Sequence, residues 1–269
     1  MTEDKTGSAI SARAGRAGTA RESGDGPGFK NSDRQAGEWL PPRMREDVDI
    51  SIPYSDPPTD KLMEFYAAWA ETYDSDLIDA YGYMAPADAV AGLHALGLPQ
   101  DARILDAGCG TGQAGALLAA AGYTRVDGAD LSPEMRAVAG RLGVYRNLFH
   151  LDMTTDYAPQ LATFGGPDDG QYDAAYDAVI CVGVFGYGPP HVGDLPRIMD
   201  AARPGAPVLV TVNGKGWEKT GWDDSLMPAL TAAGVTLTAR TRIRHMVNEG
   251  VHAELLELRR GVSEIACRR

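Results

Sequence analysis

The stretch that decides the fold reads Ile104-Leu105-Asp106-Ala107-Gly108-Cys109-Gly110-Thr111-Gly112. Its apolar start predicts a buried strand, and its glycines permit a tight turn and the close approach of a ligand. A predicted helix follows, and then a second strand that ends in Asp130. A carboxylate at that place is able to accept hydrogen bonds from both hydroxyls of a ribose. The unit is therefore typical of a nucleoside-binding site.

Strands and helices alternate on both sides of this unit. Strands are predicted at 103–106, 125–130, 148–151, 176–182 and 207–212, and helices at 61–79, 86–96, 113–121, 133–142, 191–202 and 224–233. Two last strands, 236–246 and 251–258, are joined by a short turn and predict a hairpin on the sheet edge. We therefore expect an α/β fold: a doubly wound, mostly parallel seven-stranded sheet, Rossmann-like, with helices on both faces and a C-terminal antiparallel hairpin.

Composition divides the chain into a tail and one domain. Residues 1–47 are rich in Gly, Ser, Ala, Arg and Asp and predict a disordered tail, so the domain is expected at 48–269. Its first helices, at about 61–96, are expected to form a lid. Between 61 and 79 the aromatic residues share one helical face, which suits either core packing or closure over a ligand. Tyr73 stands out there, because its phenol is able to reach a carboxylate or a ribose.

Charge and cysteine content exclude several classes of protein. The net charge of −12 argues against a nucleic-acid partner, since such proteins need a positive surface. Three cysteines without a Cys-x-x-Cys pair indicate neither a disulfide framework nor a zinc site, and a reducing cytoplasm fits them best. No apolar run is long enough to span a membrane. We expect a soluble, metal-free cytoplasmic protein, monomeric or homodimeric, that acts on a small molecule.

The glycine loop also satisfies a dinucleotide pattern. Residues 110–115 match G-x-G-x-x-G, and Asp130 follows Gly112 by 18 residues, so an NAD-dependent oxidoreductase is an alternative. However, Gly108 extends the glycine pattern backwards, and Asp106 lies at the strand end beside the loop. A carboxylate there would repel a pyrophosphate. S-adenosylmethionine suits it better, because this nucleoside carries a sulfonium and an ammonium group and no phosphate.

Five motifs in order carry a resemblance to a known family. Residues 104–112 and 127–135 resemble the first two motifs of the class I S-adenosylmethionine-dependent methyltransferases. Residues 150–153 are similar to the acidic position after the third strand of that family, 176–183 to its fourth strand, and 203–206 to the turn before its fifth, where Ala206 replaces a frequent glycine. Within the superfamily, residues 66–74 and 183–192 resemble the Williams–Beuren syndrome region methyltransferase-like group.

The resemblance implies S-adenosylmethionine as cofactor and a role for each matching residue. The methionine part would lie against Gly108, Gly110 and Gly112, with Asp106 near its amino group. Asp130 would hold the ribose hydroxyls. The adenine would be bordered by Leu131 and Met135 and bound by Asp152 and Met153. The floor beneath the sulfonium would be formed by Cys181 to Gly183.

The acceptor side has weaker signals. His191 follows the fourth strand, where a ligand crevice is expected, and is a candidate general base; Tyr187 is the second candidate. Trp217 and Trp222, after the fifth strand, suit either an acceptor pocket or the covering of the sheet end. We expect methyl transfer to an oxygen or nitrogen of a small molecule, because a sulfonium needs only an aligned nucleophile. A protein that binds the cofactor without transferring methyl is a further alternative.

Overall fold

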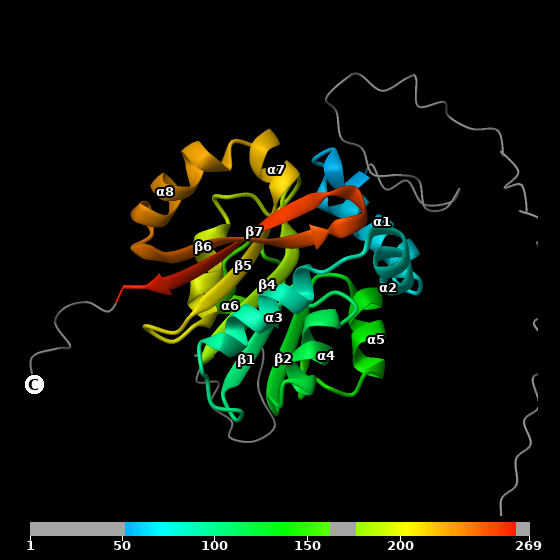
Figure 1. Ribbon diagram of the computed structural model, residues 1–269, viewed down its shortest axis with the longest axis horizontal. Coiled ribbons are helices and arrows are strands. Elements are labelled where there is room, and N and C mark those ends of the chain that lie inside the picture. The colour runs from blue at the N-terminus through cyan, green and yellow to red at the C-terminus, as the bar shows by residue number, and fades with distance from the viewer. Residues whose placement is uncertain (1–51, 162–175, 262–269) are drawn as a thin grey trace, which may run out of the picture. The chain divides into compact units, whose positions relative to one another are not determined.

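The computed structural model describes residues 52–161 and 176–261 of the chain (Figure 1). The tail predicted for residues 1–47 lies outside the described residues. Among the helices of the described ranges, none is both long and apolar enough to cross a membrane.

The predicted seven-stranded sheet forms the centre of the fold, and its strand order is β3-β2-β1-β4-β5-β7-β6 (Figure 1). The first five of these strands run parallel, and β7 pairs antiparallel with β5 and with β6. The hairpin thus joins the edge of the sheet through its second strand. The strands are β1 (Arg103–Ala107), β2 (Arg125–Asp130), β3 (Leu148–His150), β4 (Ala178–Phe185), β5 (Val208–Asn213), β6 (Val235–Met246) and β7 (Val251–Arg260).

Two hydrophobic clusters, one on each face, bind helices to this sheet. Successive side chains of a strand point to opposite faces, so Ile104 enters one cluster and Leu105 the other. The Ile104 face is covered by α3 (Ala85–Ala95) and α4 (Gln113–Ala120), and α5 (Pro133–Arg141) packs beside them on β2 and β3. The Leu105 face is covered by α6 (Tyr157–Leu161), the 3-10 helix η4 (Leu195–Ala201) and α8 (Trp222–Ala232).

The helix predicted over 61–79 is broken into three pieces. They are α1 (Thr59–Trp69), α2 (Tyr73–Ser75) and a π-helical turn, η3 (Asp76–Ala80). The break is held by Asp76, whose Oδ2 accepts hydrogen bonds from Trp69 Nε1 at 2.7 Å and Thr72 Oγ1 at 2.8 Å. It lets Trp69 and the residues after it pack on Met246 and Val251, at the tip of the β6–β7 hairpin. The prediction of one continuous helix was therefore wrong.

Other helices differ from the sequence prediction in smaller ways. The helix expected at 191–202 is the shorter η4, with Pro196 in its first turn. Two short helices, α6 and α7 (Gly214–Lys219), were not predicted; Asn213 begins α7 by accepting from the amides of Lys215 and Gly216. The predicted N-cap of α5 is confirmed, because Ser132 Oγ accepts from Met135 N at 3.2 Å.

Tyr145 lies in a socket made by three glycines beneath the glycine loop. A Cβ at Gly115 would lie 2.2 Å from its hydroxyl, and a Cβ at Gly128 or Gly112 would lie 3.0 to 3.2 Å from its ring. From this socket the hydroxyl donates a hydrogen bond to Asp106 Oδ2 at 2.7 Å. The third glycine of the G-x-G-x-x-G pattern thus makes room for a side chain of the protein itself.

The socket predicts opposite effects for two helix glycines. Gly115→Ala in α4 forces Tyr145 away from Asp106, and we expect it to lower the free energy of unfolding by about 1–3 kcal/mol despite the better helix propensity of alanine. Gly140→Ala in α5 is the matched control: its Cβ would meet only Leu148 Cδ1, at 3.5 Å. It should raise stability by about 0.5–1 kcal/mol. Urea unfolding measures both, and equal stabilisation by both substitutions would contradict the socket.

Candidate functional site

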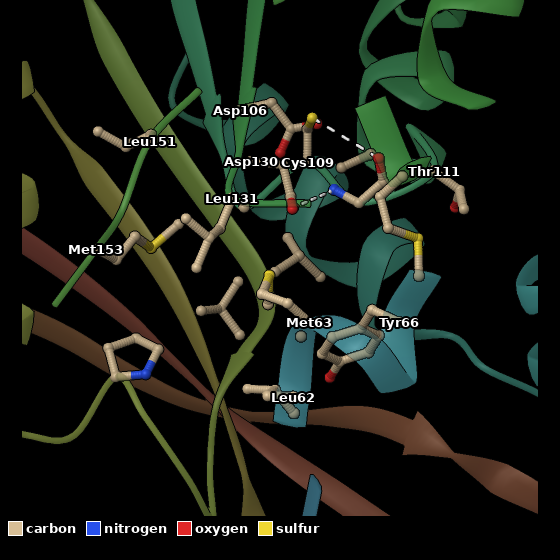
Figure 2. Close-up of a pocket in the computed structure, with 18 of the residues that line it drawn as sticks. Leu62, Met63, Tyr66, Asp106, Cys109, Thr111, Asp130, Leu131, Leu151 and Met153 are labelled. Atoms are coloured by element: carbon tan, nitrogen blue, oxygen red, sulfur yellow. Dashed lines mark hydrogen bonds between the residues drawn. The ribbon is translucent and has the colours of Figure 1, made fainter. Parts of the chain in front are cut away.

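A cavity, here called the loop cavity, lies at the carboxyl ends of β1, β2, β3 and β4, the place where ligands bind in doubly wound sheets. Figure 2 shows Asp106 and Asp130 on its sheet side and Met63 and Tyr66 of α1 opposite them. Most residues that the sequence singled out for the cofactor line it: Tyr73, Asp106, Gly108, Gly110, Asp130, Leu131, Met135, Asp152, Met153 and Gly183.

Two residues of the same set do not line the cavity. Gly112 begins α4 with a φ of 98°, and a Cβ there would lie 2.6 Å from Leu142 Cδ1, so its role in the structure is to allow the turn. Cys181 is fully buried within the core of the Leu105 face, where burial raises the pKa of its thiol. Its neighbours Val182 and Gly183 reach the cavity instead.

Asp130 connects the second strand to the glycine loop. Its Oδ2 accepts from Gly110 N at 2.9 Å, and its Oδ1 accepts from Ser132 N at 2.8 Å. Burial raises the pKa of this carboxyl, while the two amide hydrogen bonds lower it. Each oxygen keeps a further lone pair, so the carboxylate is oriented by the backbone and still able to accept from a ligand.

Asp106 is the second acid of the loop cavity and is 1% exposed. Its pKa is raised to about 7. Burial is the largest cause, the nearby charge of Asp130 also raises the pKa, and the hydrogen bond from Tyr145 lowers it.

Neither Lys nor Arg is found among the described residues that line the cavity. Arg136 lies just behind the cavity and donates to the carbonyl oxygens of Asp130 and Leu131. The three acids of the lining, Asp106, Asp130 and Asp152, still favour a ligand that brings positive charge and no phosphate.

Glycines shape the cavity wall at two places. A Cβ at Gly108, which has a φ of 73°, would lie 2.3 Å from Val184 Cγ2. Gly183 has a φ of 74°, and a Cβ there would lie 2.3 Å from Tyr83 Oη. The register of β4 against β5 shifts between Cys181 and Phe185, and this bulge turns the backbone at Gly183 toward the cavity.

Asp152 caps a local turn and also lines the loop cavity. Its Oδ1 accepts from Thr154 N at 2.8 Å and from Thr154 Oγ1 at 2.6 Å, as in a turn that an aspartate caps. The residue also lines the loop cavity beside Met153. The local turn therefore orients the carboxylate, which leaves its other oxygen to a ligand.

Asp74 in α2 was not singled out as a site residue, although it joins the N-terminal helices to the glycine loop. Its Oδ1 accepts hydrogen bonds from Thr111 Oγ1 at 2.5 Å and from Gln113 Nε2 at 2.7 Å. Two of the three residues after Gly110 thus hold the segment that covers the cavity. The only signal for it in the sequence was its place beside Tyr73.

A second cavity, here called the aromatic cavity, adjoins the first. It is bounded by the N-terminal helical segment, by residues 183–189 after the bulge, and by the ends of β5 and β6. Its lining includes Tyr54, Trp69, Tyr81, Tyr187 and His245. The two cavities share seven lining residues, which form the boundary between them: Leu62, Tyr66, Tyr73, Tyr83, Gly183, Val184 and Pro189. Sequence reasoning missed Tyr83 and His245, since neither belongs to a motif.

The two candidate bases lie in different surroundings. Tyr187 lines the aromatic cavity and packs edge-on against Tyr54 at 4.7 Å between ring centroids. His191 lines neither cavity; its side chain is 52% exposed, with Nε2 3.4 Å from Asp56 Oδ1.

Trp217 and Trp222 are buried in the core under the sheet end, so they cover it. Within the described ranges, no cluster of His, Cys, Asp and Glu suits a metal ion.

Fold and site together define the Rossmann-like class of nucleoside-cofactor proteins, and comparison with known proteins narrows the class. A model of a methyltransferase-domain family matches residues 80–254, and the chain belongs to this family. Human methyltransferase-like protein 27 is 34% identical to it over 151 residues, which cover 55% of this chain and 56% of that protein. The match thus spans little more than half the length of this relative.

Solved structures share the fold. Magnesium protoporphyrin IX methyltransferase from Synechocystis PCC 6803, with bound S-adenosylhomocysteine (SAH), has a TM-score of 0.55 and 17% identity, covering 76% of this chain and 100% of that one. Burkholderia thailandensis 1,6-didemethyltoxoflavin-N1-methyltransferase, also with bound SAH, has a TM-score of 0.51 and 22% identity, covering 77% and 91%. The chain therefore contains a methyltransferase domain, and S-adenosylmethionine is the cofactor that its sequence motifs imply.

The loop cavity fits this cofactor. Gly108 lines the cavity and lets the side chains of Val184 and Met153 pack against the loop, and the acids Asp106 and Asp130 complement a cation. The dinucleotide alternative is set aside, because the same acids repel a pyrophosphate and Tyr145 occupies the space at Gly115.

The raised pKa of Asp106 predicts a pH-dependent affinity for SAH. If its carboxylate attracts the amino group of SAH, binding improves as Asp106 ionises through a pKa of about 7. Affinity should therefore rise about tenfold between pH 6 and pH 8. Asp106→Asn should bind more weakly and lose this dependence, whereas Asp101→Asn, exposed at the opposite end of β1, should keep it. Calorimetric titration across pH measures both; an unchanged profile in Asp106→Asn would refute the assignment.

The Asp74 contacts predict that the helical segment contributes to SAH binding. Asp74→Ala removes two hydrogen bonds to the loop, and we expect SAH affinity to fall about tenfold, with faster hydrogen exchange over residues 59–80. Glu71→Ala is the matched control. Its pairing with Arg141 also ties this segment to the core, but both side chains are more than half exposed, so the change should be small. Equal effects of the two substitutions would count against Asp74 as the tie.

Proposed function

We propose that this methyltransferase modifies an oxygen or nitrogen of a small molecule. The observation that carries the proposal is a second cavity beside the loop cavity, with Tyr66, Tyr73, Tyr83 and Gly183 lining both. A cavity lined by side chains suits a small acceptor better than a protein surface or a nucleic acid, which an acidic chain with a charge of −12 also disfavours.

The proposed cofactor contacts follow from the lining of the loop cavity. Asp130 accepts from the ribose hydroxyls, and Asp106 attracts the amino group of the methionine part. Asp152 and Met153 bind the adenine, bordered by Leu131 and Met135. When bound, S-adenosylmethionine supplies a methyl group that its sulfonium already activates. The chain then has three tasks: to orient the acceptor beside Gly183, to exclude water, and to keep Tyr73 and α1 over the cofactor.

Three finer assignments concern the lid, the family group and the candidate bases. The N-terminal helices act as a lid, which the hydrogen bonds of Asp74 to Thr111 and Gln113 support. The placement in the Williams–Beuren syndrome region methyltransferase-like group rests on residues 66–74 and 183–192. His191 and Tyr187 stay predictions as bases; of the two, only Tyr187 has a position in the aromatic cavity.

Turnover with labelled S-adenosylmethionine tests the function. We expect SAH to form in step with a methylated product when the acceptor panel contains small aromatic alcohols and amines. Asp130→Ala should lower kcat/KM for S-adenosylmethionine at least tenfold, through a higher KM, because the ribose hydroxyls lose the carboxylate that accepts their hydrogen bonds. SAH binding without product from any acceptor would favour a binding protein that does not transfer methyl. Stabilisation by NADH and not by SAH would favour the oxidoreductase alternative.

A further inference from the structure

The lining of the aromatic cavity carries no formal charge. The described lining consists of aromatic and aliphatic residues, glycine, proline, methionine, asparagine and histidine, without Asp, Glu, Lys or Arg. The loop cavity next to it is lined by Asp106, Asp130 and Asp152. A charged ligand in the aromatic cavity would lose its hydration without gaining a counter-ion. The cavity therefore favours an uncharged ligand.

Eight of its 19 lining residues are Tyr, Trp or Phe. Trp69 and Tyr73 pack edge to face at 4.7 Å between centroids, and Tyr66 and Tyr73 at 6.2 Å. Burial raises the pKa of Tyr66 to about 12 and raises the pKa of Tyr83 as well, so both phenols stay protonated at neutral pH. Such walls offer edges and faces to a flat aromatic ring, a preferred geometry for ring pairs.

His245, near the carboxyl end of β6, is the polar group that the proposed function leaves unused. It lines the aromatic cavity, is 4% exposed, and packs edge-on against Tyr83 at 5.2 Å. Its Nε2 lies 3.0 Å from Asn213 Nδ2. The Oδ1 of Asn213 already accepts from the amides of Lys215 and Gly216, which begin α7. The side-chain amide of Asn213 is thereby oriented with its NH₂ group toward the histidine.

This orientation determines the tautomer of His245. Asn213 Nδ2 donates, so Nε2 must offer its lone pair, and the ring proton belongs on Nδ1. Burial lowers the pKa of His245 to about 4, which keeps the ring neutral at physiological pH. Within the described residues, Nδ1 has no hydrogen-bond partner and is almost completely covered by neighbouring atoms, so an acceptor atom has to displace one of them to reach it. Buried N–H groups without a partner are rare, because they cost free energy that a bound acceptor atom would recover.

We propose that the aromatic cavity is the acceptor-substrate site and that it takes a neutral, flat aromatic molecule whose oxygen or nitrogen lone pair accepts a hydrogen bond from His245 Nδ1. The proposal rests on the proposed function and names its substrate class. His245 anchors the far end of the ring system, and the boundary with the loop cavity, at Tyr83 and Gly183, receives the atom to be methylated. His245 is thus a specificity residue and a donor, and its lone pair on Nε2 is occupied by Asn213.

Nitrogen-15 NMR of the wild-type full chain, saturated with SAH, tests the tautomer and the donor directly. We expect one histidine with a protonated Nδ1 and an unprotonated Nε2 from pH 6 to pH 8, identified by its absence in His245→Phe. Isoquinoline, which is neutral above pH 7 and has a ring-nitrogen lone pair, should shift this Nδ1–H signal. A protonated Nε2, or a signal that isoquinoline leaves in place, would overturn the proposal.

Calorimetry on the SAH-loaded chain tests the ligand class. Isoquinoline should bind to wild type, naphthalene at least tenfold more weakly, and naphthalene-2-sulfonate not measurably. His245→Phe should lose the preference for isoquinoline over naphthalene and keep SAH affinity, which also reports that it folds. His252→Phe on the exposed face of β7 is the matched control and should behave as wild type.

The two proposals fail in different ways. Equal binding of isoquinoline and naphthalene by wild type, or tight binding of the sulfonate, overturns the substrate class and leaves methyl transfer intact. Normal ligand binding without SAH formation from any acceptor contradicts the proposed function and leaves the aromatic cavity with its ligand class.

Discussion

The carboxylate of Asp130 holds the site together. Its two oxygens take the amides of Gly110 and Ser132, and so connect the glycine loop after β1 with the start of α5 after β2. Because β1 and β2 are parallel neighbours, both loops emerge at one edge, and one short side chain reaches each. The cavity wall, the orientation of this acid and the N-terminus of α5 therefore depend on the same pair of hydrogen bonds.

A second acid gives the site its charge. Asp106 is buried beside Asp130, with Tyr145 as hydrogen-bond donor and three glycines making room for that tyrosine. Burial and a neighbouring carboxylate both disfavour its charged form, so the cofactor-free site tends to hold a proton that a cationic ligand displaces. The neutral aromatic cavity lies just beyond. Charge thus separates the half of the site proposed for the cofactor from the half proposed for the acceptor.

Long, periodic elements were predictable from the sequence, and short or strained ones were not. All seven strands lie within three residues of their predicted ends. The five parallel strands read as apolar runs between turns, and the two antiparallel strands are separated by the turn at 248–250. The prediction of one helix over 61–79 was wrong because Asp76 accepts hydrogen bonds from Trp69 and Thr72, and the segment packs against the hairpin tip. Hydrophobic periodicity does not report such tertiary contacts. The helix expected at 191–202 is a shorter 3-10 helix, η4, with Pro196 in its first turn.

The sequence by itself determined the sheet, the glycine loop and the acids at the ends of β1 and β2, since local pattern and spacing specify these. The tertiary structure alone decided what faces the cofactor side and the acceptor side. Tyr83, Asp74 and His245 come from a loop, a one-turn helix and the outermost strand, and they meet the site only after the hairpin folds against the N-terminal helices. Contacts between residues so distant in sequence leave no periodic signal, because no local backbone geometry requires them.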